Sequence, residues 1–156
     1  MVLAAALPSL VSAKEPLHVA PKLEVAPGVQ INEGLSDCPF RETFGEMLKL
    51  ALHKENGMFA PGKVPTSAGR SLQVRLVGFS LTGNGFLGHD TQLQFEGALY
   101  QDGKKVAGFT DSVRFQTDTM ITVCAQLRSN LDAEAIQIAK WVRKPVDGQE
   151  LKRWGE

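Results

Sequence analysis

The sequence predicts an α+β protein in which two helices pack on one face of a mostly antiparallel sheet of about four strands, in the order β-α-β-β-β-α. Two segments repeat apolar residues every three or four positions, as helices do. Three others alternate apolar and polar residues, as strands do. The chain has 156 residues, of which 43% are hydrophobic, enough for one domain with its own core.

The first thirteen residues, MVLAAALPSLVSA, are apolar and uncharged. They predict a signal peptide that is cleaved after Ala13, because the three residues before that point are small or apolar. No Lys or Arg precedes the apolar run, which a start codon placed too far downstream would explain. The run is too short to cross a bilayer. The alternative is a short N-terminal strand or a buried segment.

Residues 14–35 contain three prolines and predict an extended segment that includes the first strand. The first helix is expected to begin at Asp37-Cys38-Pro39, where Asp and Pro suit a helix N-terminus. It is expected to continue to about Lys54, before Asn56-Gly57.

Alternation predicts three strands, around residues 72–76, 92–101 and 106–115. The sequence Asp102-Gly103 between the last two is typical of a hairpin turn, so the strands should form an antiparallel meander. One apolar stripe then predicts a helix over residues 118–144, which Pro145 ends. Ser129-Asn130 leaves open a break into two helices. Residues 36–145 would be the core domain and 146–156 a polar tail.

Two cysteines, Cys38 and Cys124, fall near the N-terminal regions of the two predicted helices. In an exported protein an even pair of cysteines is a candidate disulfide, and closing a loop of this length would stabilise the fold. The alternative is two buried free thiols.

The segment GNGFLG, residues 83–88, has the written form G-x-G-x-x-G of a dinucleotide-binding loop. Such a loop must open a helix whose N-terminus holds the pyrophosphate. Here the following residues alternate as in a strand, so the segment is expected to be a hairpin connection. Its two large apolar residues, Phe86 and Leu87, either fold back onto the core or project and contact a partner. With His89 they are the candidate partner contacts.

The sequence carries no recognisable catalytic motif. His89-Asp90 suggests an acid–base pair, but neither of the other histidines lies at a zinc-binding spacing. We therefore expect no cofactor and no metal. Lys+Arg and Asp+Glu are equal at 17 each, which argues against an extended nucleic-acid surface.

The chain from Leu72 onward resembles a family of small bacterial envelope proteins of unknown function, several of them lipoproteins. The resemblance lies in LQVRLVGF, GNGFLG, LQFEGALY, DGKKVAGF and a final helix holding Cys124, Ala139 and Trp141. It implies an α+β domain that works in the periplasm by contact and not by catalysis. The chain lacks a lipobox cysteine, so the resemblance does not extend to membrane anchoring.

These observations predict a protein of a Gram-negative-type periplasm with no transmembrane segment in its mature chain. Its expected role is non-catalytic binding of another envelope protein or a cell-surface component. A binding protein for a small apolar ligand, held between helices and sheet, is the alternative, and an enzyme of unknown class comes third.

Overall fold

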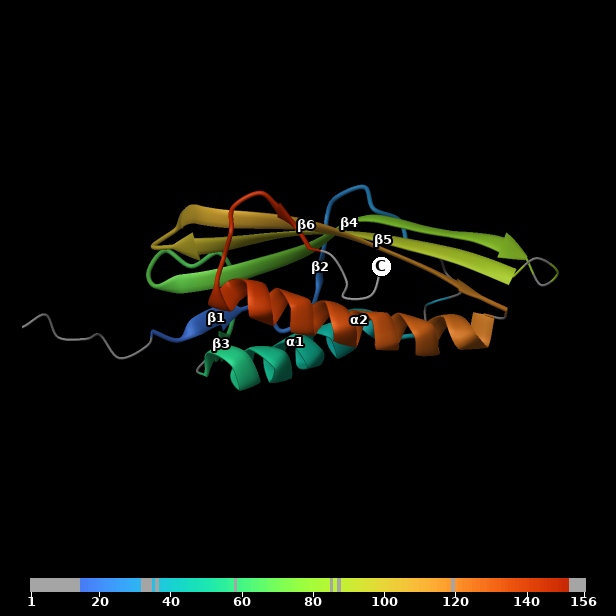
Figure 1. The fold of residues 1–156 in the computed structure, drawn as a ribbon, viewed down its shortest axis with the longest axis horizontal. Coiled ribbons are helices and arrows are strands. Elements are labelled where there is room, and N and C mark those ends of the chain that lie inside the picture. Colours follow the sequence, from blue (N-terminus) through green and yellow to red (C-terminus); the bar gives the residue numbers. More distant parts are fainter. Residues whose placement is uncertain are drawn as a thin grey trace, which may run out of the picture.

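The computed structural model describes residues 15–31, 35, 37–57, 59–84, 86, 88–118 and 120–151. A seven-stranded mixed sheet forms one layer and two helices form the other, on one face of the sheet, as Figure 1 shows. The elements are β1 (Leu17–Val19), β2 (Glu24–Val25), α1 (Phe40–Asn56), β3 (Phe59–Pro61), β4 (Arg70–Asn84), β5 (Gly88–Gln101), β6 (Lys104–Thr117), α2 (Met120–Arg143) and β7 (Gln149–Glu150). The predicted α+β class is confirmed.

Three long strands form the centre of the sheet. β4 pairs with β5 and β5 with β6, both antiparallel, as the predicted meander requires. In the turn between β5 and β6, Asp102 and Gly103 have φ of 51° and 79°. Two positive φ angles are what a two-residue type I′ turn needs, and an Asp-Gly pair adopts them readily. Local turn chemistry therefore sets this half of the sheet.

The prediction of about four strands in the order β-α-β-β-β-α is wrong, because short strands extend the sheet on both sides. The strand order is β3-β1-β4-β5-β6-β7, and β2 also pairs with β4. β1, β2, β3 and β7 have only two or three residues each, too few for alternation to reveal them. All their pairings are parallel, so their partners are distant in the chain and no turn signal marks them.

The two helices lie side by side and run in the same direction (Figure 1). Near their C-terminal ends, Arg143 of α2 forms an ion pair with Glu55 of α1 at 3.1 Å. α2 passes through Ser129-Asn130 without a break. The side chain of Asn130 donates a hydrogen bond to the Gln126 carbonyl one turn earlier, within the same helix, and does not start a second one.

The apolar stripes of both helices meet the inner face of the sheet and form the core. Aromatic pairs connect the layers, with ring centroids 6.0 Å apart for Phe44 and Phe95 and 4.8 Å apart for Phe109 and Trp141. The backbone at Pro21 packs closely against α1 at Gly45. A Cβ atom on Gly45 would lie 2.0 Å from the Pro21 carbonyl oxygen. That glycine lets the connection between β1 and β2 lie against the helix.

The chain after α2 returns to the sheet. The Asp147 carboxylate accepts a hydrogen bond from the Gly108 amide at 2.9 Å, β7 extends the β6 edge, and Leu151 is buried. The first part of the predicted polar tail is therefore attached to the sheet. The predicted signal peptide, residues 1–13, and the last five residues lie outside the described residues.

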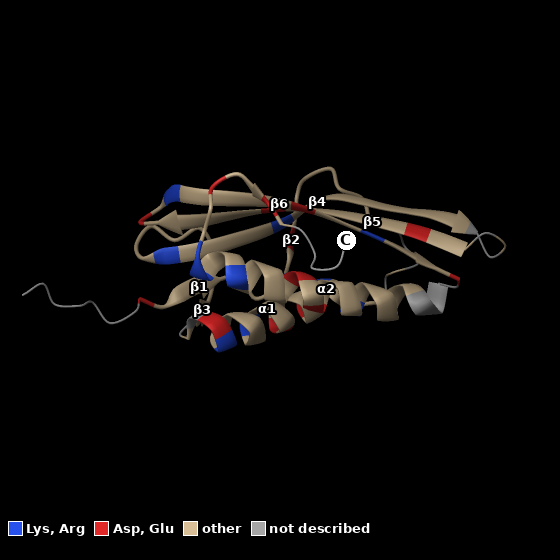
Figure 2. Ribbon diagram, viewed as in Figure 1, with Lys and Arg blue, Asp and Glu red and all other residues tan. Residues whose placement is uncertain are grey.

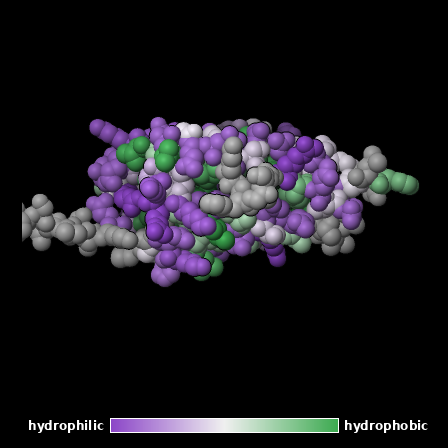
Figure 3. Space-filling view, in the orientation of Figure 1, coloured by the Kyte–Doolittle hydropathy of each residue, from purple (hydrophilic) through white to green (hydrophobic). Residues whose placement is uncertain are grey.

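Surface chemistry differs between the two ends of the molecule. Lys and Arg gather at the end where β1 lies and both helices finish, as Figure 2 shows. The face seen in Figure 3 is largely hydrophilic, with small separate apolar patches. No helix in the described part of the chain combines the length and the apolar character needed to cross a membrane.

Candidate functional site

The candidate site is the end of the β4–β5 hairpin together with the end of β6 beside it. We call this region the tip and define it as the described residues within 82–90 and 116–118. The tip contains two of the three predicted contact residues. Phe86 lies in the turn with its side chain 100% exposed, and His89 is the second residue of β5. Leu87 lies outside the described residues.

The glycines of GNGFLG shape a hairpin and not a phosphate-binding loop. Gly83 belongs to β4 and Gly88 to β5, which is an antiparallel partner, so no helix follows the third glycine. Both glycines have positive φ, and a Cβ atom on Gly83 would lie 2.0 Å from the Gly88 carbonyl oxygen. The predicted hairpin connection is therefore confirmed, and the glycines allow its close backbone approach.

A hollow of about 290 Å³ opens at the tip. Its lining is Thr82, Gly83, Gly88, His89, Asp90, Gln116, Thr117 and Asp118. All three long strands contribute to it at the point where they end. Its walls are mainly polar, in contrast to the apolar core a short distance along the same strands.

Two buried polar atoms at the hollow make no hydrogen bond with the residues that the structure describes: Nδ1 of His89 and Oγ1 of Thr117. Thr117 is only 7% exposed, so its hydroxyl is withdrawn from solvent as well. A buried polar atom without a partner costs about 1–3 kcal/mol of folding free energy. The two side chains lie side by side on the same face of the sheet, because His89 and Thr117 are register partners on neighbouring strands. They therefore offer hydrogen-bonding capacity that the described fold does not use.

Asp90 is paired with Arg114 and not with His89. The Arg114 Nε donates to both Asp90 carboxylate oxygens, at 3.0 and 3.1 Å, and its Nη2 donates to one of them. These hydrogen bonds hold the pKa of Asp90 below its ordinary value and raise the pKa of Arg114. Successive strand residues point to opposite faces, so Asp90 and His89 face apart. The structure does not bring them together as an acid–base pair.

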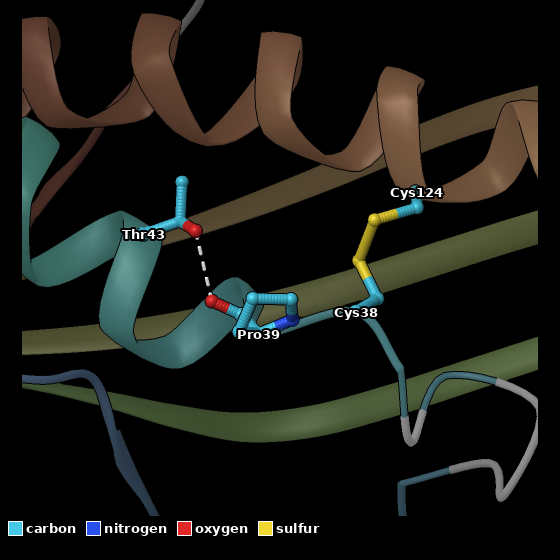
Figure 4. Close-up of a disulfide and its surroundings, with 4 residues drawn as sticks. All are labelled: Cys38, Pro39, Thr43 and Cys124. Carbon is cyan, nitrogen blue, oxygen red and sulfur yellow. Dashed lines mark hydrogen bonds between the residues drawn. A yellow bond between two sulfur atoms is a disulfide. The ribbon is translucent and has the colours of Figure 1, made fainter.

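The cysteines form a disulfide. Cys38 and Cys124 are bonded, with Cα atoms 5.9 Å apart, which confirms the predicted pairing (Figure 4). Cys38 precedes α1 and Cys124 lies in the first turns of α2, so the bond joins the helices near their N-terminal ends. Next to it, the Thr43 hydroxyl donates to the Pro39 carbonyl at 2.8 Å. A bonded Cys124 has no thiol to act as a nucleophile.

Metal sites and apolar ligand cavities are two other kinds of site that a protein of this size can hold. No group of three or more His, Cys, Asp and Glu side chains is arranged to hold a metal ion in the described part of the chain. A hollow between the β1–β2 connection, α1 and β4 has only about 10 Å³, space for one water molecule at most. It gives no support to the alternative of a small apolar ligand held there.

Sequence reasoning missed Arg114 and Thr117 as parts of the tip. If residue pairs are counted along β5 and β6 away from the Asp102-Gly103 turn, the end of β6 falls beside His89. A bulge at Val106 shifts this count by one residue, since Leu99 pairs with Ala107 while Tyr100 pairs with Lys105. A shift of one residue exchanges the two faces of a strand, so the count alone would assign the wrong neighbours.

No protein-family model matches the sequence, and no curated protein matches it. Solved structures do share its fold. A Xanthomonas campestris protein of the family of unknown function DUF330 aligns with a TM-score of 0.57 and 16% identity, over 82% of this chain and 83% of that one. A minor lipoprotein of Acinetobacter baumannii gives 0.51 and 14%, over 83% and 93%.

A hypothetical protein of Chlamydia trachomatis gives a TM-score of 0.50 and 10% identity, over 81% of this chain and 98% of that chain. The resemblance to small bacterial envelope proteins, including lipoproteins, therefore extends over most of the chain. At 10–16% identity it establishes a common fold.

Proposed function

We propose that the chain is an exported protein of the bacterial cell envelope and that it binds another envelope protein through the tip. The observation that carries the proposal is a fully exposed Phe86 next to a polar hollow with unused hydrogen-bonding groups. Protein interfaces commonly combine an aromatic anchor with polar groups around it.

Two features support an envelope location. The Cys38–Cys124 disulfide persists in oxidising compartments, of which the periplasm is one. The apolar residues 1–13 have the composition of a signal peptide. The lipoprotein among the proteins of similar fold agrees with both.

The pairing of the hairpin strands supports a role in contact. The strands pair without interruption from Gly78 to Asn84, and the Asp90–Arg114 ion pair connects β5 to β6 just below the turn. The tip therefore presents the exposed Phe86 side chain at the end of a formed hairpin, where a partner can reach it.

Two substitutions at the tip test the proposal by capture of envelope proteins on immobilised protein. Phe86→Ser should remove the anchor and abolish capture of a specific partner, while the melting temperature stays unchanged. Leu50→Ser is the matched control, because Leu50 is 69% exposed on α1, away from the tip. It should retain capture.

Thr117→Val tests the hollow separately. Valine has nearly the shape of threonine but no hydroxyl, so it removes an unused polar atom and should slightly stabilise the protein. If a polar group of the partner enters the hollow, the same change should weaken capture. Capture that is equal for the wild type and both tip variants would sink the proposal.

A further inference from the structure

The end of the molecule opposite the tip carries a cluster of cationic side chains, which we call the basic end (Figure 2). It comprises Lys54, Lys63, Arg70, Lys104, Lys105, Lys140, Arg143 and Lys144. These residues come from the C-terminal ends of both helices, the start of β4 with the loop before it, and the start of β6. Hydrogen bonds between Gly69 and Asp102 hold that loop against the β5–β6 turn.

The opposite half of the three long strands is nearly uncharged. Residues 78–84, 88–94 and 112–118 contain only Asp90, Arg114 and Asp118 as charged groups. The chain has a formal net charge of zero. The excess of cations at the basic end is therefore balanced by an excess of acidic side chains in the rest of the chain. Such a separation orients a molecule in the field of a charged surface.

Acidic side chains at the basic end are already engaged. They are Glu15 with Gln101, Glu55 with Arg143, Asp102 with Gly69, and Asp147 with Gly108. Four acidic groups face eight cationic ones. The lysines therefore dominate the field that this end presents to its surroundings.

The fold itself explains only part of this cluster. Both helices end here, and a cation near a helix C-terminus is stabilised by the helix dipole. That reason applies to Lys54, Lys140 and Lys144. It does not apply to Lys63 and to the two lysines at the start of β6, which belong to a loop and a hairpin.

Exposed apolar side chains accompany the cations. Val106 is 54% exposed and Val146 is 56% exposed. The two valines lie near each other along the chain contacts. Val106 is two residues from Gly108, and Gly108 forms hydrogen bonds with Asp147 and Gly148, which directly follow Val146. Figure 3 shows small apolar patches surrounded by hydrophilic surface toward this end. Apolar groups flanked by lysines are typical of surfaces that rest in the headgroup region of a membrane.

The N-terminal part of the chain joins the structure at the same end. Leu17 of β1 pairs with Arg70, the first residue of β4, and Glu15 contacts the β5–β6 turn. Residues 1–14, whose sequence is mainly apolar, therefore connect to the basic end and not to the tip.

We infer that the basic end docks on a bilayer that contains anionic phospholipid and that the tip then points away from the membrane. The inference rests on the proposed envelope location. β4 has 15 residues, and a strand of that length spans about 50 Å. Docking would thus hold Phe86 about that far from the lipid surface, where a second envelope protein can reach it.

Flotation with lipid vesicles tests the inference, because it needs neither the partner nor the cell. The full chain should float with vesicles of phosphatidylcholine and phosphatidylglycerol and much less with phosphatidylcholine alone. A lysine near an anionic surface contributes about 1 kcal/mol, so the variant Lys63→Gln, Lys104→Gln, Lys144→Gln should bind about 100-fold more weakly at low ionic strength. Added salt should reduce the difference.

The matched control is Lys22→Gln, Arg75→Gln, Arg128→Gln, which removes the same charge from positions away from the basic end. Both variants keep residues 1–14, so membrane binding by that segment is common to them. Equal flotation of the two variants would overturn the inference. The inference would also be overturned if the wild type bound a soluble DNA duplex as tightly as it binds the anionic vesicles. Loss of partner capture by Phe86→Ser would leave the flotation result unaffected, so the two proposals fail independently.

Discussion

Gly97 and Phe109 show how single residues fix the contact between sheet and helix. They are paired across β5 and β6, and a Cβ atom on Gly97 would lie 2.0 Å from the Phe109 ring. The ring therefore lies across the glycine, and its other contact is the edge-to-face pair with Trp141 of α2. The Trp141 indole also donates to the Val146 carbonyl at 3.1 Å, which connects α2 to the chain that follows it.

Gly97→Ala should lower the free energy of unfolding by about 1–3 kcal/mol, because the added methyl group must displace a ring that is held on its other side. Chemical denaturation measures the change. Gly62→Ala is the control: nothing lies within 4 Å of a Cβ atom there, so its effect should be near zero. Equal effects of the two substitutions would show that the Phe109 ring can move at little cost.

At the residue scale, the candidate residues could be predicted from the sequence, but the residues that contact them could not. The exposed Phe86 and the disulfide cysteines could be selected from residue type and position alone. The partner of Asp90 could not, because it depends on the pairing register of β6. The unused hydroxyl of Thr117 could not either, since threonine at a strand end is ordinary and only its burial distinguishes it.

Among the elements, the two helices are joined most firmly through the Cys38–Cys124 bond. The bonded residues are 86 positions apart in the chain. In the loop-entropy model, closing a loop of this length stabilises the folded state by about 4.6 kcal/mol. The bond lies near the N-terminal end of each helix, while the Glu55–Arg143 ion pair joins the other ends. Because that ion pair is exposed, the disulfide is the stronger connection.

Replacing both cysteines with serine should therefore lower the melting temperature by about 10 °C. Reduction of the wild type should lower it by a similar amount, and scanning calorimetry measures both. Helix content by circular dichroism should be retained at low temperature, because the apolar stripes of α1 and α2 remain. A melting temperature that does not change would contradict the stabilising role.

Long elements were predictable because their patterns repeat many times. α2 presents one apolar stripe over 24 residues, and part of each long strand alternates apolar and polar residues. The short strands were not predictable, and neither were the bulges at Val77 and Val106. Each bulge adds a single residue to one strand, yet it exchanges the faces of everything beyond it. Val106, which has no partner on β5, is 54% exposed.

For the whole molecule, the sheet should lose stability gradually toward the tip. β5 is paired on both sides along its length, whereas β1 and β2 cover only residues 70–72 and 75–76 of β4. Within the described residues, no strand pairs with the outer edge of β4 beyond Leu76 or with that of β6 beyond Thr110. The tip end of the sheet is therefore a three-stranded ribbon with two open edges.

Hydrogen exchange followed by NMR should reveal this gradient. Amides of β5 near Leu93–Leu99 should exchange slowest, and those of β4 between Gly78 and Asn84 should exchange faster, because local opening needs fewer broken contacts there. Amides of β4 near Arg70–Leu72, which pair on both sides, provide the internal comparison. Uniform protection along β4 would contradict the expectation.

The overall architecture followed from the sequence because periodicity separates helices from strands and because two one-sided helices need a sheet to cover. The parallel pairings at the sheet edges depend on residues far apart in the chain, which single-sequence patterns do not encode. The charge separation between the two ends was equally hidden. It arises when the fold brings loops, helix ends and a hairpin to one place, although the sequence contains no charged run.

The position of Cys38 has a consequence for an exported chain that emerges with its N-terminus first. Cys38 would reach the oxidising side of the membrane well before Cys124, which lies 86 residues later. The strands β1, β2 and β3 would also arrive before β4, the strand against which they assemble. The first half of the protein would thus remain unassembled, with a free Cys38 thiol, until the second half was exported. During that time Cys38 could form disulfides with cysteines of other proteins.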